Sequence, residues 1–213
     1  MTNSNEQIKF WQDNFGKEYT GRNTFSIKEL DRFYLDTYGV TRSTLNTEFL
    51  GNLDKDIKIL EVGCNIAQQL RHLQQLGFKN LYGIEIQHDA IEKAKSLTKD
   101  INIIYGSGLD IPFKDNWFDL VFTSGVLIHI APENIDKVIN EIYRCTNKHV
   151  WGFEYYSENL EEIDYRGNKG FLWKNDFCQL FVNNHKDLKK VMEKKIKYTQ
   201  NDNVDMMYLL EKV

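Results

Sequence analysis

The chain has 213 residues, of which 41% are hydrophobic and 27% charged, and its formal net charge is −4. A chain of this length and composition can bury one ordinary globular core. The acidic balance excludes a strongly basic surface, so we expect neither a nucleic-acid partner nor binding to an anionic membrane.

Targeting signals and cysteines indicate the compartment. Residues 1–25 contain no basic start followed by an apolar run, so we expect no signal peptide. The longest apolar runs have the length of strands and are too short to span a bilayer. Cys64, Cys145 and Cys178 are widely spaced and form no CxxC pair, which favours buried, reduced thiols and argues against structural zinc. These features predict a cytoplasmic protein.

The N-terminal quarter of the chain has a helical pattern. Ser26 and Glu29 fit a capping box, and apolar residues follow them at helical spacing. A further helix is expected over 43–51. Together these segments predict a helical cap that precedes the main fold.

Aromatic residues form a stripe nearer the N-terminus. Trp11, Phe15 and Tyr19 recur every four residues, which predicts one face of a single N-terminal helix. Packing against the rest of the protein would explain this stripe. The functional alternative is a lid over a bound ligand, with Tyr19, Arg22 and Asn23 near that ligand.

From residue 57 the pattern alternates between strand and helix. Helical segments separate the apolar runs that predict strands. One of these helices is expected to end at Gly77 and another to begin at Pro132. His72 and His88 are expected on helix surfaces. Strands are predicted over 57–62, 81–86, 101–106, 117–125 and 149–156. This alternation indicates a parallel sheet covered by helices on both faces.

The C-terminal segment breaks the alternation. Residues 188–198 and 205–213 are both strand-like and are separated only by "TQNDNV". So short a connection requires antiparallel strands, because a parallel return needs a crossover of a dozen or more residues. The predicted fold class is therefore α/β, with a mostly parallel seven-stranded sheet that ends in an antiparallel hairpin.

The turn after the first strand, in "KILEVGCNIAQQL" (58–70), is the place to look for a ligand. In open parallel sheets, ligands bind outside the carboxyl ends of the strands. A turn that holds a pyrophosphate is rich in glycine, whereas this one has only Gly63. Glu61 would repel phosphates and instead suits a cationic or hydroxylated ligand.

The same stretch resembles motif I of the class I S-adenosylmethionine-dependent methyltransferases. That motif has an acid, one further residue and then Gly-x-Gly-x-Gly. Glu61 and Gly63 match it, while Asn65 and Ala67 replace the second and third glycines. Glu85 matches the acid expected to bind the ribose hydroxyls, at roughly the usual interval of about 20 residues.

The resemblance extends over residues 55–155 and implies a Rossmann-like fold with S-adenosylmethionine as cofactor. "GSGLDIPFKDNWFDLVFTSGVLIHI" is similar to the third and fourth motifs, with Ser107 where an adenine-contacting Asp is common. A ligand with a sulfonium and an amino acid tail needs carboxylates and backbone carbonyls in its site, and the two acids would supply the carboxylates. The alternative to a ligand-binding role is that each acid merely caps a strand or helix end. The implied cofactor-binding residues are Glu61, Gly63, Cys64, Asn65, Glu85, Ile86, Ser107, Gly108, Leu109, Ser124, Tyr19 and Asn23.

A narrower resemblance concerns the acceptor. Residues 10–23 and 154–177 look like the ends of methylases associated with pseudaminic acid biosynthesis. This similarity implies a small polar acceptor, a sugar or nonulosonic acid-type metabolite, and is compatible with an acidic sugar or a sugar nucleotide. We expect one domain over 1–213, made of a helical cap (1–52), a cofactor-binding core (53–156) and an acceptor-side segment (157–213).

Methyl transfer from a sulfonium is an in-line displacement that depends chiefly on alignment. A base is needed only if the acceptor must lose a proton. His129 and Glu154 are the candidate bases, although His129 could simply pack or orient a loop. No cluster of metal ligands is evident, so we expect metal-independent chemistry.

The loop over 164–174 carries positive charge within an acidic protein. Arginine can hold a carboxylate with two hydrogen bonds, which would suit an acidic acceptor. An ordinary solvated loop is the alternative. The predicted acceptor-binding residues are Tyr155, Tyr165, Arg166 and Lys174.

Two other functions are compatible with the same pattern. A nicotinamide-dependent oxidoreductase shares the alternation, but Glu61, the missing glycines and the terminal hairpin count against it. A non-catalytic module that binds the nucleoside without turning over an acceptor is the second alternative.

Overall fold

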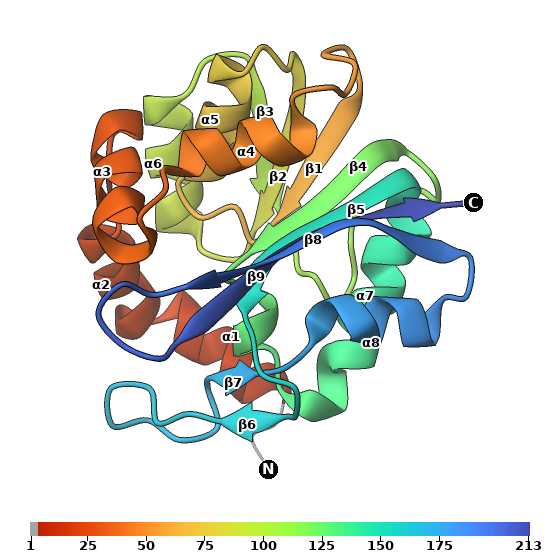
Figure 1. Ribbon diagram of the computed structural model, residues 1–213. Coiled ribbons are helices and arrows are strands. Elements are labelled where there is room, and N and C mark those ends of the chain that lie inside the picture. The colour runs from red at the N-terminus through yellow and green to blue at the C-terminus, as the bar shows by residue number, and fades with distance from the viewer. Residues whose placement is uncertain (1–3) are drawn as a thin grey trace.

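The computed structural model describes residues 4–213, which form a three-layer α/β fold around one seven-stranded sheet (Figure 1). The strand order is β3-β2-β1-β4-β5-β9-β8. The strands are β1 (Lys58–Val62), β2 (Asn80–Glu85), β3 (Ile101–Tyr105), β4 (Phe118–Ser124), β5 (Thr146–Tyr155), β8 (Leu188–Lys197) and β9 (Val204–Lys212). Strands β1 to β5 are parallel, and β9 runs antiparallel to both β5 and β8, which confirms the predicted sheet and hairpin.

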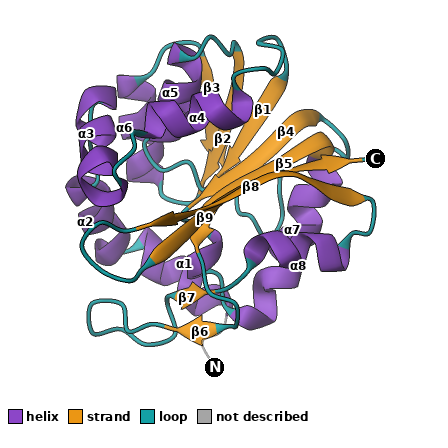
Figure 2. Ribbon diagram, viewed as in Figure 1, coloured by secondary structure: helices purple, strands orange, loops and turns teal. Residues whose placement is uncertain are grey.

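Helices cover both faces of this sheet (Figure 2). One face carries α3 (Ile27–Tyr38), α4 (Arg42–Leu50), α5 (Gln68–Gln75) and α6 (His88–Leu97). The other carries the short helix η1 (Leu127–His129), α7 (Pro132–Cys145) and α8 (Phe177–Asn184). Each face has its own hydrophobic cluster, because side chains along a buried strand alternate between the two faces; in β1, Ile59 packs on one and Leu60 on the other.

Local signals in the sequence place several helix ends correctly. Ser26 and Glu29 form the predicted capping box at the start of α3, with both reciprocal hydrogen bonds present. Gly77 follows α5 with a φ of 99°, and Pro132 occupies the first turn of α7. The three cysteines are free and buried, as expected.

The prediction of a single N-terminal helix is wrong. The chain forms α1 (Ser4–Gln12) and α2 (Asn14–Arg22), with a break at Asp13. The two helices come very close at Gly16, where a Cβ atom would lie 1.8 Å from the carbonyl oxygen of Trp11. Glycine therefore permits the contact, and Trp11 lies on a different helix from the other aromatic residues of the stripe.

His72 is also not on a surface. It is 3% exposed, and its Nδ1 atom lies 3.0 Å from the carbonyl oxygen of Gln68 in the preceding turn of α5. Helix α3 covers this face of α5, which the period of α5 alone could not reveal. His88, by contrast, is exposed and stacks on Tyr105.

A small second sheet joins β6 (Glu161–Glu162) and β7 (Trp173–Lys174). Two-residue strands have no detectable period, so the sequence did not predict them. Figure 1 shows this pair beside α1, below the carboxyl ends of the central strands. This pairing therefore holds the loop between β6 and β7 on the side of the sheet where the central strands end.

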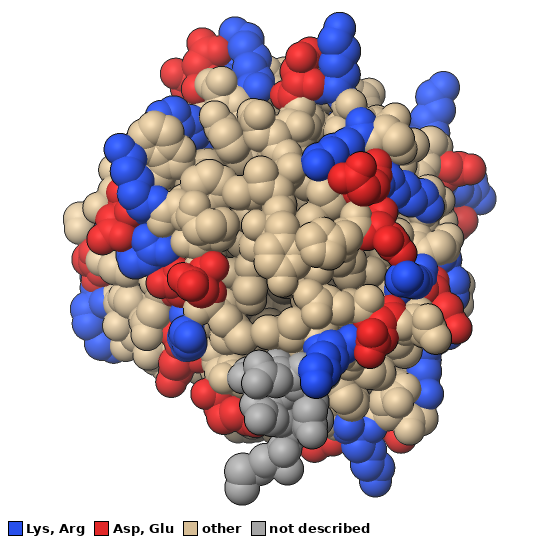
Figure 3. Space-filling model, turned by 180° about the vertical axis from the view of Figure 1, so that it is seen from behind, with Lys and Arg blue, Asp and Glu red and all other residues tan. Residues whose placement is uncertain are grey.

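Charge on the surface is mixed. Lysines line the exposed edge strand β8, where they disfavour pairing with another sheet. On the face seen in Figure 3, basic and acidic side chains of the described residues are interspersed. No helix within residues 4–213 is long and apolar enough to cross a membrane.

Candidate active site

The turn after β1 has the backbone conformation of a glycine-rich turn, built mostly from other residues. Gly63 has a φ of 72°, and a Cβ atom there would lie 2.8 Å from Val126. Asn65 and Ala67, the two departures from the motif, also have positive φ values of 46° and 59°. Asparagine tolerates this region, whereas alanine there costs roughly 1–2 kcal/mol. The turn therefore keeps its shape at some cost in stability.

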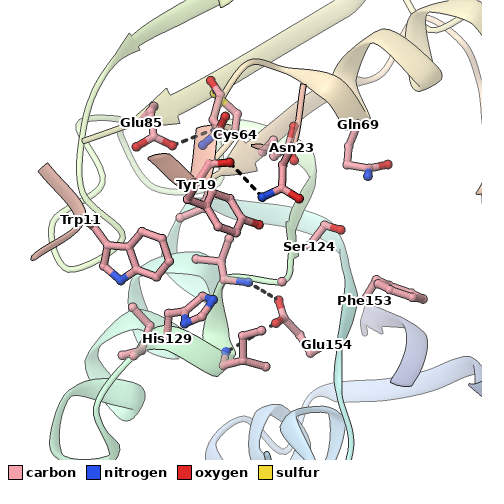
Figure 4. A pocket seen from close by; sticks show the side chains of 18 of the residues that line it. Trp11, Tyr19, Asn23, Cys64, Gln69, Glu85, Ser124, His129, Phe153 and Glu154 are labelled. Atoms are coloured by element: carbon pink, nitrogen blue, oxygen red, sulfur yellow. Dashed lines mark hydrogen bonds between the residues drawn. The ribbon is translucent and has the colours of Figure 1, made fainter. Parts of the chain in front are cut away.

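Glu85, at the end of β2, fixes this turn from the side. One carboxylate oxygen accepts a hydrogen bond from the Asn65 amide at 2.8 Å (Figure 4). The other accepts from the amides of Ile86 and Gln87, at 2.7 and 3.0 Å. Burial raises the pKa of Glu85, and the backbone amides only partly oppose that rise. The carboxylate thus lies ordered at the junction of two strand ends.

Glu61, at the end of β1, has one carboxylate oxygen without a partner. Its side chain is buried, and its Oε2 atom has no hydrogen-bond partner. Burial holds the pKa of Glu61 well above its usual range, although the positive charge of Arg42 lowers it. An unpaired buried carboxylate oxygen is costly, so this site favours a ligand that brings a cation or a hydrogen-bond donor.

Both carboxylates line a cavity of about 600 Å³ that follows the carboxyl ends of the strands. The cavity extends from β2 and the turn after β3 to the ends of β4 and β5 and the start of β9. The predicted site residues that line it are Glu61, Gly63, Cys64, Asn65, Glu85, Ile86, Ser107, Gly108, Leu109, Ser124, His129, Glu154, Tyr19, Asn23, Tyr155, Tyr165 and Arg166.

Lys174 lies outside this lining. Its ammonium group donates a hydrogen bond to the Asn203 side chain at 2.6 Å, in the turn between β8 and β9. The pairing of β6 with β7 fixes this position. The structure therefore brings Arg166 and Tyr165 of the loop to the cavity, but not Lys174.

Helices α1 and α2 close one side of the cavity. The Gln12 side chain donates to the carbonyl of Ile86 at 3.2 Å, and Asn65 donates to the Thr20 hydroxyl at 2.9 Å. On the far side, the Gln7 side chain accepts from the Ala131 amide at 3.1 Å. The two helices thus bridge the turns after β1 and β2 and the loop before α7, where a lid would lie.

Glu154, at the end of β5, is 2% exposed. Its carboxylate accepts from the amides of Val126 and Ile128, at 3.2 and 3.5 Å (Figure 4). Burial raises the pKa of Glu154 to about 7, against the opposing effect of these hydrogen bonds. The group can therefore gain or lose a proton near neutral pH, as a general base must.

His129 is held differently. Its Nδ1 atom lies 2.8 Å from the Phe171 carbonyl, which can only accept, so Nδ1 carries the proton and Nε2 the lone pair. Burial lowers the pKa of His129 to about 4, so the ring is neutral at neutral pH. It packs against Trp11 and Tyr165, with ring centroids 4.5 and 5.2 Å away. This geometry suits an orienting group better than a strong base.

A second part of the cavity, around Asp205 on β9, was not predicted from the sequence. This carboxylate is 1% exposed and accepts from the hydroxyls of Tyr38 and Tyr198, at 2.6 and 3.3 Å. Tyr34 and Phe153 complete the wall there. The signal available was an acid near the start of β9, directly before the largely apolar run 206–210.

The charges of the lining indicate the class of ligand. Four carboxyl groups, those of Glu61, Glu85, Glu154 and Asp205, face the cavity, and burial raises the pKa of each. Within the described residues no group of three or more His, Cys, Asp or Glu side chains could hold a metal ion. A ligand with hydroxyls, a sulfonium and an ammonium group fits such a lining. The fold and site together define a Rossmann-like methyltransferase of the S-adenosylmethionine-dependent class.

Comparison with known proteins identifies the family. The methyltransferase domain family matches residues 60–166, half of the chain, and the protein belongs to it, with S-adenosylmethionine as its cofactor. A curated relative, the sterol 24-C-methyltransferase of Neurospora crassa, is 28% identical over 128 residues. That match covers 54% of this chain and only 33% of the relative, so the chain spans about a third of the relative's length.

Solved structures show the same fold at low sequence identity. A putative methyltransferase of Haloferax volcanii, solved in complex with a methyltransferase activator, superposes with a TM-score of 0.73 at 14% identity, over 94% of this chain and 96% of that one. The magnesium protoporphyrin IX methyltransferase of Synechocystis, solved with bound S-adenosylmethionine, gives 0.68 at 11%, over 97% and 95%.

Proposed function

We propose that this protein transfers a methyl group from S-adenosylmethionine to a small polar acceptor. The observation that carries this proposal is the buried, unpaired oxygen of Glu61 beside the ordered carboxylate of Glu85. When bound, the cofactor supplies an activated methyl group on a sulfonium. Glu85 would hold the ribose hydroxyls, and Glu61 would face the cationic amino acid end.

The remaining cofactor contacts follow the strand ends. Ser107, Gly108 and Leu109 line the cavity after β3 and would enclose the adenine. Tyr19 and Asn23 of the lid would cover the amino acid end. A pyrophosphate would meet the Glu61 carboxylate in the turn where it needs amide donors, which argues against a nicotinamide dinucleotide.

Glu154 is the better candidate for the base. At neutral pH its carboxylate is partly ionised, whereas the imidazole of His129, with a pKa of about 4, binds protons too weakly. Glu154 would accept the proton that leaves an acceptor hydroxyl or ammonium group. His129, with its Nδ1–H fixed on Phe171, would orient the acceptor through Nε2.

We propose a sugar or nonulosonic acid-type acceptor. Arg22 and Arg166 both line the cavity near the Tyr165 hydroxyl, which gives this wall positive charge suited to a carboxylate or phosphate. The buried carboxyl groups elsewhere in the cavity suit polar groups and oppose a wholly apolar acceptor such as the sterol in the relative's name. The division of the chain into cap, core and acceptor-side segment is part of the same proposal.

Thermal unfolding tests the cofactor. At 100 times its Kd a ligand adds about 2.7 kcal/mol, which raises the melting temperature of a domain of this size by about 5–10 °C. We expect such a shift with S-adenosylmethionine and with S-adenosylhomocysteine, and none with NAD. A shift with NAD alone would overturn the proposed function, and cofactor binding without turnover on any acceptor would favour the non-catalytic module.

Replacing Arg166 tests the acceptor class. With an acidic sugar acceptor found by screening for S-adenosylhomocysteine release, Arg166→Ala should raise the acceptor KM about tenfold, because a charge-assisted pair is lost. The Kd of S-adenosylhomocysteine should stay within twofold. Lys169→Ala is the matched control, because Lys169 is an exposed cation of the same loop that does not line the cavity, and it should leave KM unchanged. An unaltered KM in Arg166→Ala would remove this role.

A further inference from the structure

We propose that the end of the cavity around Asp205 is a subsite for a protonated amine of the methyl acceptor. This inference rests on the proposed function and narrows it to acceptors that carry an ammonium group. We call the site the Asp205 subsite and define it by Asp205, Tyr38, Tyr198, Tyr155 and Phe153.

The first support is an unpaired buried oxygen. Asp205 is 1% exposed, and both tyrosine hydroxyls, those of Tyr38 and Tyr198, bond to its Oδ2 atom. Its Oδ1 atom has no hydrogen-bond partner. Buried carboxylate oxygens are normally paired, so the vacant acceptor needs a donor from a ligand. An ammonium group supplies both the donor and the compensating charge.

The second support is the aromatic surround. The Tyr38 ring lies 5.9 Å from Phe153 and 4.8 Å from Tyr198, both nearly edge-on, and Tyr155 is 6.4 Å from Tyr198. Rings of this kind attract a cation through their faces, with the largest effect where water is excluded. Neutral hydroxyl groups gain nothing comparable, so the rings and the carboxylate favour the same ligand charge.

Two neighbouring cations, Arg42 and Lys174, oppose the rise in the pKa of Asp205 through their charge, but their hydrogen bonds go to other groups. Arg42, buried behind the site, donates to Asn46, Tyr34 and Ser124 at 2.9, 3.0 and 3.3 Å, and Lys174 is bound to Asn203. Within residues 4–213, no lysine or arginine forms an ion pair with Asp205. The remaining titratable groups that face it are the hydroxyls of Tyr34, Tyr38, Tyr155 and Tyr198.

The strand order places this subsite on the acceptor side. Asp205 of β9 pairs with Tyr155 of β5. Tyr155 directly follows Glu154, the candidate base, in the chain. Glu85 is on β2, on the other side of β1 and β4 in the sheet. The Asp205 subsite is therefore separate from the ribose position. An acceptor with an acid group toward Arg166 and an amine toward Asp205, such as an amino sugar acid, would use both.

A matched pair of ligands tests the inference. With the protein saturated with S-adenosylhomocysteine at pH 8, calorimetry should show cyclohexylammonium binding at least tenfold more tightly than cyclohexanol. Asp205→Asn should reduce that preference below threefold and leave the Kd of S-adenosylhomocysteine within twofold. Asp187→Asn is the control, because Asp187 also accepts a tyrosine hydroxyl, that of Tyr143 at 2.6 Å, but does not line the cavity. It should keep the full preference.

The wild-type protein offers a second test that needs no variant. Burial raises the pKa of Asp205 to about 7, so the carboxylate ionises between pH 6 and 8 while the alkylammonium stays charged. Cyclohexylammonium affinity should rise severalfold over this range, and cyclohexanol affinity should not. Equal binding of the two ligands, or a preference that survives Asp205→Asn, would overturn the assignment of the Asp205 subsite and leave the proposed function standing. Failure to bind S-adenosylhomocysteine would overturn the proposed function with it.

Discussion

Glu85→Gln is expected to weaken S-adenosylhomocysteine binding at least about 100-fold, or roughly 2.8 kcal/mol. The wild-type carboxylate accepts from backbone amides on both of its oxygens. A glutamine side chain has one oxygen, so whichever way it turns, its NH2 group faces at least one of those N–H donors. An unsatisfied buried amide costs about 1–3 kcal/mol, and one acceptor for the ribose is also lost. Calorimetric titration would measure the change.

The control is a glutamate with the same chemistry and none of these contacts. Glu92 is exposed on α6 and pairs with Lys95 at 3.1 Å. Glu92→Gln should change the Kd by less than twofold. If Glu85→Gln binds S-adenosylhomocysteine as tightly as the wild type, the ribose does not lie at β2 and the proposed orientation of the cofactor is wrong.

The fold could be predicted closely because its signals are local. Buried parallel strands are continuous apolar runs, and the short 199–204 connection requires an antiparallel hairpin. The break at Asp13 was missed because it depends on how closely two helices pack at Gly16. The burial of His72 was missed because it depends on a covering helix from another part of the chain. Neither the spacing of hydrophobic residues nor the helix and strand propensities of the residues carry information about how separate segments pack on one another.

The candidate site also has one part that could be predicted from local sequence and another that depends on tertiary contacts. The turn from Glu61 to Ala67 is contiguous, so its motif could be recognised, and the positive φ values of Asn65 and Ala67 explain how other residues replace glycines. The Asp205 subsite joins α3, the end of β5 and the β8–β9 hairpin, which are far apart in sequence. The helical spacing of Tyr38 in the sequence is that of an ordinary core residue of an amphipathic helix. Only the tertiary structure reveals that its hydroxyl bonds to a buried acid.

Glu154→Gln should lower kcat at least tenfold, and up to about 100-fold if proton transfer limits the reaction, while the donor Kd stays within threefold. The carboxylate is the basic form, so wild-type kcat should rise with pH and level off above a midpoint near 7, the pKa of Glu154. Glutamine cannot ionise, so this rising limb should disappear in the variant. Its amide oxygen can still accept from Val126, while its NH2 group would face the Ile128 amide, whose hydrogen bond to Glu154 is the longer one at 3.5 Å. A pH–rate profile at saturating substrates measures both effects.

His129→Ala separates the base from the orienting group. Because burial keeps the pKa of His129 at about 4, its ionisation cannot produce a limb near pH 7. Loss of an orienting group should therefore lower kcat about tenfold and leave the midpoint of the pH–rate profile, near 7, unchanged. If the rising limb instead survives in Glu154→Gln and vanishes in His129→Ala, the two roles are reversed. In that case the acceptor, once bound, must raise the pKa of the imidazole by placing a negative charge beside it.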